Sequence, residues 1–334
     1  MPSCSVAVVL GLCASVLAVP NPVARLLNKR QTLTSFNDGE YLAHASFPIY
    51  SPRILTQRCC FTVDILNYAL TLEHLEATFY REGLAKFTGA DFIAAGFPQS
   101  SYDRLKEVAA HEAAHVDFLS TALGSAATKE CTYAFPMSSV AVFLATASLL
   151  EGVGVSAYLG AARQIANKDY LTAAGSILTV ESRHSAYLRD TSSQEKLSPF
   201  PSAQDVGLSP NAVYTLASAF IASCPETNPA LPVKPFPALA SGATGPVAAG
   251  QTVQLKTDGA KLVMGTSTAK LYAAFITAGE PVYADLVEAG DGMTFSVTVP
   301  QGVAGQSYLV LCNCKERVDD STIVAGPAII EVTA

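Results

Sequence analysis

The sequence Glu112-Ala-Ala-His115 recurs further along the chain as Glu181-Ser-Arg-His184, and the two copies lie in helices predicted over about 101–123 and 169–189. Residues three apart on an α-helix share one face, so each Glu-x-x-His motif directs a carboxylate and an imidazole toward the same point. With only five histidines in 334 residues, even one chance match is unexpected. The repeated motif therefore predicts two helices that supply ligands to one metal site.

Each motif follows a helical segment that carries a candidate single glutamate. Glu151 lies near the middle of a long Ala- and Leu-rich helix predicted over 136–167. Burying a carboxylate there without a partner would cost several kcal/mol, and a bound metal ion would offset that cost. The earlier helix, predicted over 60–86, offers Glu73 and Glu76 one turn apart. Four helices with this ligand pattern form a bundle that can bind two bridged metal ions.

The order Glu, Glu-x-x-His, Glu, Glu-x-x-His resembles the ferritin-like superfamily of di-iron and di-manganese carboxylate proteins. The segment Leu66-Asn-Tyr-Ala-Leu-Thr-Leu-Glu-His-Leu-Glu-Ala-Thr-Phe-Tyr80 narrows the match. It resembles secreted fungal ferritin-like proteins linked to stress response and sexual development, and plant desiccation-related proteins are similar over the same segment. The resemblance covers about residues 55–190 and, more loosely, the C-terminal region. It implies a ferritin-like four-helix bundle with a dimetal site, and no defined substrate.

The resemblance also favours Glu73 over Glu76 as the ligand from the first helix. Tyr80 follows Glu73 by seven residues, the spacing at which many ferritin-like proteins place a tyrosine near the metals, and we assign it a catalytic role. Glu76 is left as an acid just outside the ligand set or as a solvated residue. His74 and His111 each adjoin a proposed ligand but point about 100° away from it, so we predict that both are surface residues.

The predicted ligands of the two ions are Glu73, Glu112, His115, Glu151, Glu181 and His184, with Glu112 and Glu181 as the bridges. Oxygen-rich ligands with two imidazoles suit iron and manganese equally. We expect an oxidative metalloenzyme that reacts with oxygen or peroxide. Metal sequestration without turnover and a structural, stress-protective role are the alternatives. A buried carboxylate cluster would be costly to fold without metal, which favours the first two.

The N-terminal segment predicts export from the cell. Residues 6–18 form an apolar run that is too short to span a membrane and is typical of a signal peptide, which we place at residues 1–18. Lys29-Arg30 resembles a dibasic maturation site that would end a propeptide at 19–30 and leave Gln31 as the first residue. A polar arm, 31–55, would then lead into a bundle at 56–192. We expect a secreted, extracellular or cell-wall protein.

Charge and composition narrow the range of partners. Loss of residues 1–30 would remove three cations and no acids, changing the formal net charge from −7 to −10. Such a surface repels nucleic acid and anionic membranes, and no later apolar stretch predicts a membrane anchor. The partners we expect are metal ions, with oxygen or peroxide as reactants. The oligomeric state is left open.

Six cysteines follow the predicted maturation site: Cys59, Cys60, Cys131, Cys224, Cys312 and Cys314. An even number in an oxidising compartment predicts at least one disulfide, although the pairing is not determined. The sequence contains no Asn-x-Ser/Thr, so N-glycosylation is not expected.

The composition changes after the bundle. Residues 193–239 are rich in Ser and Pro, with a helix predicted over 210–224 and a Pro-rich linker after it. Six strands are predicted in 240–334, separated by turns about every ten residues: 252–257, 270–277, 282–287, 293–299, 308–312 and 328–332. This pattern favours an immunoglobulin-like β-sandwich, so the predicted fold class is mainly α with a β domain. That domain contains no His, which argues against a copper site in it.

Overall fold

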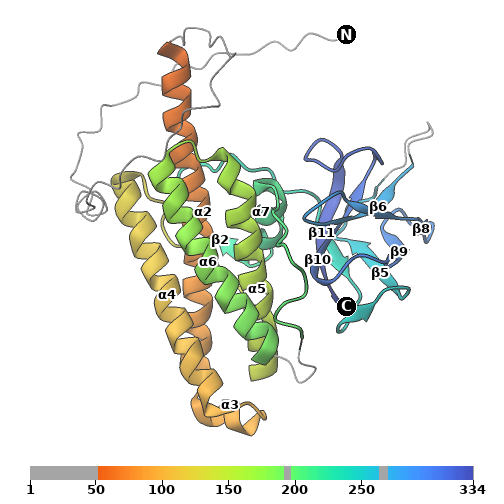
Figure 1. The fold of residues 1–334 in the computed structure, drawn as a ribbon, viewed down its shortest axis with the longest axis horizontal. Helices are drawn as coiled ribbons and strands as arrows, with labels where there is room; N and C mark the ends of the chain where they lie inside the picture. Colours follow the sequence, from red (N-terminus) through yellow and green to blue (C-terminus); the bar gives the residue numbers. More distant parts are fainter. Residues whose placement is uncertain (1–51, 192–196, 263–269, 334) are drawn as a thin grey trace, which may run out of the picture. The chain divides into compact units, whose positions relative to one another are not determined.

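The computed structural model describes residues 52–191, 197–262 and 270–333, without the side chains of 52–61 (Figure 1). The predicted signal peptide, the propeptide and residues 31–51 of the predicted arm lie outside the described residues. So do the side chains of Cys59 and Cys60. The first described helix starts at Pro52, so the last four residues of the predicted arm are helical.

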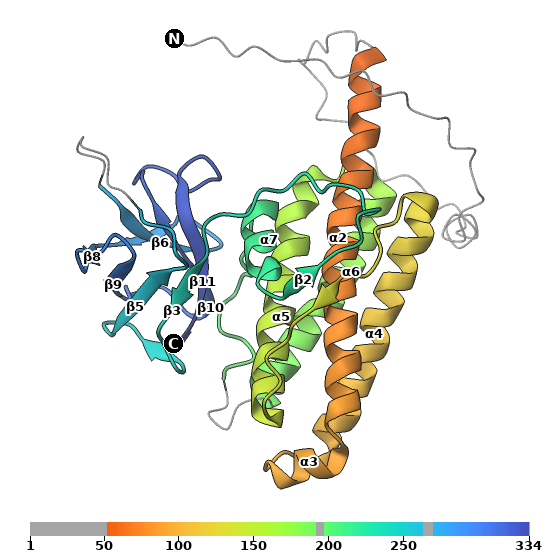
Figure 2. The same ribbon diagram turned by 180° about the vertical axis from the view of Figure 1, so that it is seen from behind.

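Four long helices form a bundle, as the sequence predicted. They are α2 (Pro52–Lys86), α4 (Gln99–Leu123), α5 (Val140–Ala161) and α6 (Lys168–Thr191). Helix α2 packs along α4, and α5 packs along α6, while α2–α5 and α4–α6 contacts join the two pairs (Figures 1 and 2). A short helix, α3 (Gly89–Ala94), connects α2 to α4 and begins with a capping box between Thr88 and Asp91.

Helix α5 is the central helix of the bundle. Its own residues are apolar on nearly every side, and most of them are buried, as expected for a core helix. The segment Val140–Gln164 is long and apolar enough to cross a membrane, and it is the one such segment within the described ranges. However, 72% of its most apolar window is buried inside the protein, and a core helix passes the same test of length and composition.

The chain after the bundle packs back against it. Helix α7 (Pro210–Ser218) is shorter than the predicted 210–224, because the next residues form a strand, β2 (Ile221–Ser223). This strand pairs with β1 (Thr132–Tyr133) in the loop between α4 and α5. A disulfide between Cys131 and Cys224 joins the same two segments, which confirms the prediction of at least one disulfide. Cys312 and Cys314 are free thiols.

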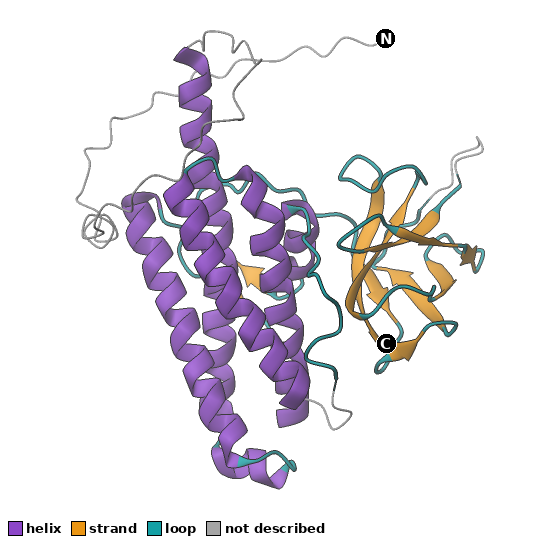
Figure 3. Cartoon of the chain, viewed as in Figure 1, coloured by secondary structure: helices purple, strands orange, loops and turns teal. Residues whose placement is uncertain are grey.

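The C-terminal region is a β-sandwich (Figure 3). One sheet has the order β3-β5-β9-β8 and the other β4-β11-β10-β6-β7, and side chains from both fill one core. This order matches the A-B-E-D and G-F-C arrangement of immunoglobulin-like domains, with further edge strands beside G and C. The strand bounds are β3 Leu239–Ser241, β4 Val247–Ala248, β5 Thr252–Thr257, β6 Tyr272–Ile276, β7 Val282–Ala284, β8 Leu286–Glu288, β9 Thr294–Thr298, β10 Gly305–Cys312 and β11 Ile323–Thr333.

This domain differs from the prediction in its strand division and bounds. Strands β10 and β11 begin at Gly305 and Ile323, earlier than the predicted 308 and 328. The single strand predicted over 282–287 is divided at Asp285 into β7, which pairs with β6, and β8, which pairs with β9 in the other sheet. Strands β3 and β4 were not predicted, because segments of two or three residues carry too little alternation to be recognised.

Strand β10 is fastened to helix α5 on both sides of Glu151. The Tyr308 hydroxyl donates to the Gly152 carbonyl (2.9 Å), and the Gln306 amide donates to the Leu149 carbonyl (3.2 Å). A Cβ atom at Gly152 would lie 2.5 Å from the end of the Gln306 side chain, so a larger residue there would displace the Gln306 amide. The β domain therefore supports the backbone of a helix that contributes to the site described next.

Candidate metal centre

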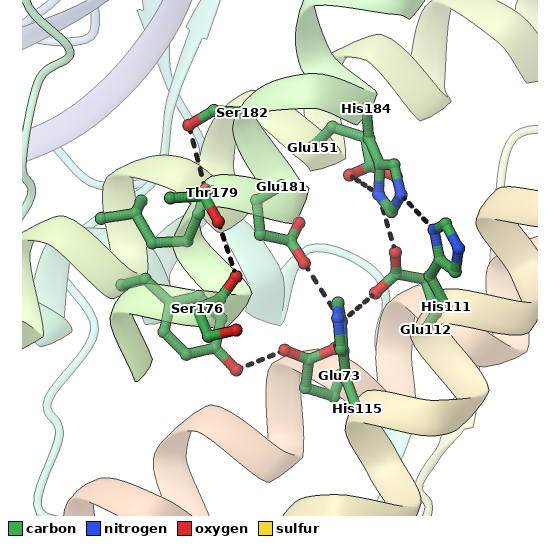
Figure 4. Close-up of polar contacts among 12 residues, drawn as sticks. Glu73, His111, Glu112, His115, Glu151, Ser176, Thr179, Glu181, Ser182 and His184 are labelled. Carbon is green, nitrogen blue, oxygen red and sulfur yellow. Dashed lines mark hydrogen bonds and ion pairs between the residues drawn. The ribbon is translucent and has the colours of Figure 1, made fainter. Parts of the chain in front are cut away.

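All six predicted ligands converge in the core of the bundle (Figure 4). The four glutamates are fully buried, and His115 and His184 are 8% and 5% exposed. Their ligand atoms form two groups, each with all atoms within 4.8 Å of one another: Glu73, Glu112, His115 and Glu181, and Glu112, Glu151, Glu181 and His184. Glu112 and Glu181 belong to both groups, which is the placement that a bridging carboxylate needs.

Both imidazoles present Nδ1 to this centre. Glu112 reaches both of them, with Oε2 3.1 Å from His115 Nδ1 and Oε1 3.0 Å from His184 Nδ1. His115 Nδ1 also lies 3.2 Å from Glu73 Oε2 and 3.3 Å from Glu181 Oε1, and His184 Nδ1 lies 3.1 Å from Glu151 Oε2. The two Glu-x-x-His motifs therefore aim at one shared carboxylate cluster, as the helical spacing predicted.

Two buried tyrosines hydrogen-bond to the single glutamates, and each tyrosine contacts the glutamate of the other helix. The Tyr80 hydroxyl donates to Glu151 Oε1, and the Tyr158 hydroxyl donates to Glu73 Oε1. Tyr158 was not among the predicted site residues, although it follows Glu151 by seven residues, just as Tyr80 follows Glu73. The pair α2–α4 and the pair α5–α6 thus repeat one pattern, a Glu with a Tyr seven residues later, followed by a Glu-x-x-His.

Glu76 is a seventh buried polar residue beside the centre. It is 4% exposed, which excludes the solvated alternative. A Cβ atom at Gly154 of α5 would lie 2.7 Å from Glu181 Oε2 and 3.1 Å from Glu76 Oε1. The missing side chain at Gly154 therefore leaves room for both carboxylates. In the repeated pattern, Gly154 occupies the position in α5 that Glu76 occupies in α2.

This close approach predicts the effect of Gly154→Ala. The added methyl group must displace the ends of two flexible side chains, so we expect the bundle to fold while metal affinity falls about tenfold or more. Gly175→Ala on α6 is the matched control, because a Cβ there meets nothing within 4 Å. The control should gain roughly 0.5–1 kcal/mol of helix stability and keep its metal affinity. Equal metal binding by both variants, measured by calorimetric titration, would contradict the prediction.

Burial shifts the acids of the centre toward their protonated forms. It raises the pKa of Glu73 to about 7, against hydrogen bonds from His115 and Tyr158 that lower it. Burial and neighbouring carboxylates together raise the pKa values of Glu76 and Glu181 well above the usual range and raise that of Glu151. Glu112 is the exception. Hydrogen bonds from both imidazoles outweigh its burial and lower its pKa to about 2.

The pKa values of His115 and His184 are raised, whereas burial alone would lower them. Burial lowers the pKa of an imidazole, but hydrogen bonds to Glu112, Glu181 and Glu73 raise that of His115 to about 12. Contacts with Glu112 and Glu151 raise the pKa of His184 to about 9. Without metal, protons on the imidazoles and on several acids therefore balance the charge of the cluster.

The residues fit a pair of divalent cations. Among the described residues, Oε2 of Glu181 is buried without a hydrogen-bond partner. Within the same part of the chain, Oε1 of Glu181 and Oε1 of Glu112 are each approached only by an imidazole Nδ1 that also faces other carboxylate oxygens. Buried acceptors without donors are costly, and cations between them would remove that cost. Four carboxylates would also neutralise two divalent ions, and oxygen-rich donors with two imidazoles suit iron and manganese.

The two remaining histidines of the bundle differ from each other. His74 is half-buried rather than on the surface, and its Nε2 lies 3.1 Å from the Thr128 carbonyl oxygen. His111 is exposed, as predicted, but its Nδ1 lies 3.0 Å from His184 Nε2 (Figure 4). This contact was not foreseen, because it joins two helices whose relative position the sequence does not specify.

Comparison with known proteins agrees with the geometry. Residues 62–194 match the family model of the ferritin-like domain. Protein rds1 of Schizosaccharomyces pombe (strain 972 / ATCC 24843) is 24% identical in an alignment of 327 residues that covers 81% of each chain. The helical region is thus ferritin-like, and the similarity to protein rds1 is distant.

Proposed function

We propose that the bundle binds two iron or manganese ions and uses them for oxidative chemistry with oxygen or peroxide. One observation carries this proposal: two Glu-x-x-His motifs and two single glutamates meet in a buried core and form two ligand groups that share Glu112 and Glu181. One ion would be held by Glu73, Glu112, Glu181 and His115, and the other by Glu112, Glu151, Glu181 and His184.

When bound, such a metal pair supplies the electrons that reduce oxygen or peroxide. The protein's own contribution is orientation and exclusion of water. Tyr80 and Tyr158 hold the two single glutamates through their hydroxyl groups and are themselves buried. Each also places an oxidisable phenol against a ligand carboxylate, which is the basis for proposing a catalytic role for Tyr80.

The deciding experiment begins with elemental analysis of protein isolated from a secreting host, where we expect two equivalents of iron or manganese per chain. Fe(II) added in air to the metal-free protein should then be oxidised faster than in buffer, or peroxide should be consumed. His115 belongs to one ligand group only, so His115→Ala should empty that metal position. The activity should be abolished, because the proposed chemistry needs both ions. The fold should largely survive, since the apolar faces of four helices hold it.

Asp117→Ala, an exposed change on the same helix, is the control and should keep the activity. A wild-type protein that binds two ions but shows neither reaction would favour sequestration instead. A protein that purifies without metal, and whose melting temperature does not respond to added metal, would favour a structural role. This last inference holds because a ligand that binds only the native state must stabilise it.

We also propose that the protein is secreted and begins near Gln31. The apolar N-terminal run and Lys29-Arg30 support this proposal, and the Cys131–Cys224 disulfide is compatible with an oxidising compartment. N-terminal sequencing of protein from the culture medium is expected to start at or close to Gln31. Recovery of chains that still begin at Met1 would reject the proposal.

A further inference from the structure

The two halves of the centre differ at the residue that precedes each Glu-x-x-His motif. In α4 this residue is His111, and in α6 the corresponding residue is the half-buried Val180. The position before the motif therefore carries an imidazole in α4 and an apolar side chain in α6. The difference affects only one of the two ligand histidines.

His184 is contacted at both ring nitrogens. Its Nδ1 faces Glu112 at 3.0 Å and Glu151 at 3.1 Å, while its Nε2 lies 3.0 Å from Nδ1 of His111. The two imidazole planes are within 9° of parallel, with centroids 5.2 Å apart (Figure 4). Among the described residues, the polar contacts of His115 are all made by Nδ1, with Glu73, Glu112 and Glu181.

This difference matters once metal is bound. A histidine that binds a metal through Nδ1 carries its proton on Nε2, and an acceptor at Nε2 selects that tautomer and fixes the ring orientation. A neutral His111 with its own proton on Nε2 offers such an acceptor at Nδ1. The carboxylate contacts of His115 cannot serve this purpose, because they are made by the nitrogen that must bind the ion.

We propose that His111 is a positioning residue for His184 and that it makes the two metal positions inequivalent. The position built from Glu112, Glu151, Glu181 and His184 binds its ion more tightly and fills first. The position that contains His115 lacks this support and fills second. This inference rests on the proposed dimetal site, and it assigns a role to an exposed residue outside the ligand set.

The test is a titration of the metal-free protein with Co(II). Calorimetry measures the affinity of each step, and visible absorption reports on the coordination of the ion. Wild type should bind two ions in separable steps. His111→Ala should weaken the tighter step by about 10- to 100-fold, the usual effect of losing such a hydrogen bond, and leave the weaker step unchanged.

Two single-site backgrounds identify which ion responds. In His115→Ala protein only the His184 position is intact, and adding His111→Ala should lower its Co(II) affinity by the same 10- to 100-fold. In His184→Ala protein, where the His115 position is left, adding His111→Ala should change nothing. An equal loss in the two backgrounds would show that His111 acts on the bundle as a whole and would overturn the proposal.

A rescue variant separates positioning from a structural effect. In His111→Asn the side-chain Oδ1 is as many bonds from Cα as Nδ1 of histidine and can accept from His184 Nε2–H, so it should restore most of the affinity that alanine loses. Val180→His gives His115 the corresponding partner and should tighten the weaker step. Asp117→Asn, exposed on α4, is the control and should alter neither step.

The outcomes separate this inference from the proposed function. A wild-type protein that binds no Co(II) overturns both. If wild type binds two ions, and His111→Ala leaves both affinities unchanged or weakens both equally, the role of His111 is overturned while the dimetal site stands.

Discussion

Replacement of Glu112 by glutamine is expected to abolish the binding of both metal ions, whereas replacement of Glu151 should remove one. Glu112 contacts both imidazoles and belongs to both ligand groups, while Glu151 belongs to one. A neutral amide keeps the shape of the side chain but cannot supply the bridging charge. Elemental analysis should therefore fall from two equivalents of metal per chain to none in Glu112→Gln and to one in Glu151→Gln.

The same variant should destabilise the metal-free protein. Glu112 is the carboxylate against which His115 and His184 hold their protons, and removing one partner of a buried charge pair costs about 3–5 kcal/mol. Glu107→Gln on the same helix is the matched control, because Glu107 is exposed and its pair with Arg104 is exposed too. Its cost should be at most about 1 kcal/mol. A Glu112→Gln protein that retains two ions would show that Glu112 is not the bridge.

Metal is expected to stabilise the protein strongly at pH 8 and weakly at pH 5. The metal-free protein should itself lose stability as pH rises, because the native state binds extra protons. Glu73, with its pKa raised from 4.5 to about 7, loses its contribution as pH rises across that interval. His184, raised from 6.5 to about 9, loses its contribution between those values, and His115, raised to about 12, adds to the loss above pH 6.5.

Glu112 acts in the opposite sense but in another pH range. Its pKa is lowered from 4.5 to about 2, so its contribution is present above pH 4.5 and is lost as pH falls toward 2. Between pH 5 and 8 it is ionised in both the native and the unfolded state and changes nothing. The metal-free protein should therefore be most stable near pH 5.

Metal binding reverses this trend because the ions must displace the same protons, so the apparent affinity rises with pH. At a free metal concentration 1,000 times Kd, each ion adds about 4 kcal/mol. Melting curves of metal-free and Mn(II)-loaded protein at pH 5, 6.5 and 8 measure the difference. We expect the increase in melting temperature caused by Mn(II) to grow with pH and to disappear in Glu112→Gln. A stabilisation that is the same at pH 5 and 8 would contradict the predicted ligand protonation.

What could be read from the sequence was local. The spacing of Glu112 and His115, and of Glu181 and His184, places each pair on one helical face whatever the rest of the chain does, because three residues make nearly one turn. The apolar period along the four helices was equally local, and it predicted the bundle. Segments of alternating apolar and polar residues between regular turns predicted the β-sandwich. The prediction missed β3 and β4 and left β7 and β8 as one strand.

Contacts between elements were decided only by the tertiary structure. Glu73 and Glu76 are one turn apart on α2 and look alike in sequence. Their environments differ because Gly154 on α5 opens space for Glu76 beside Glu181, while Tyr158 binds Glu73. The contact of His111 with His184 and the pairing of Cys131 with Cys224 likewise join segments that are 73 and 93 residues apart. The sequence by itself determined which residues share a helical face, whereas helix packing determined which faces meet, because side-chain distances across a core depend on the whole set of packed residues.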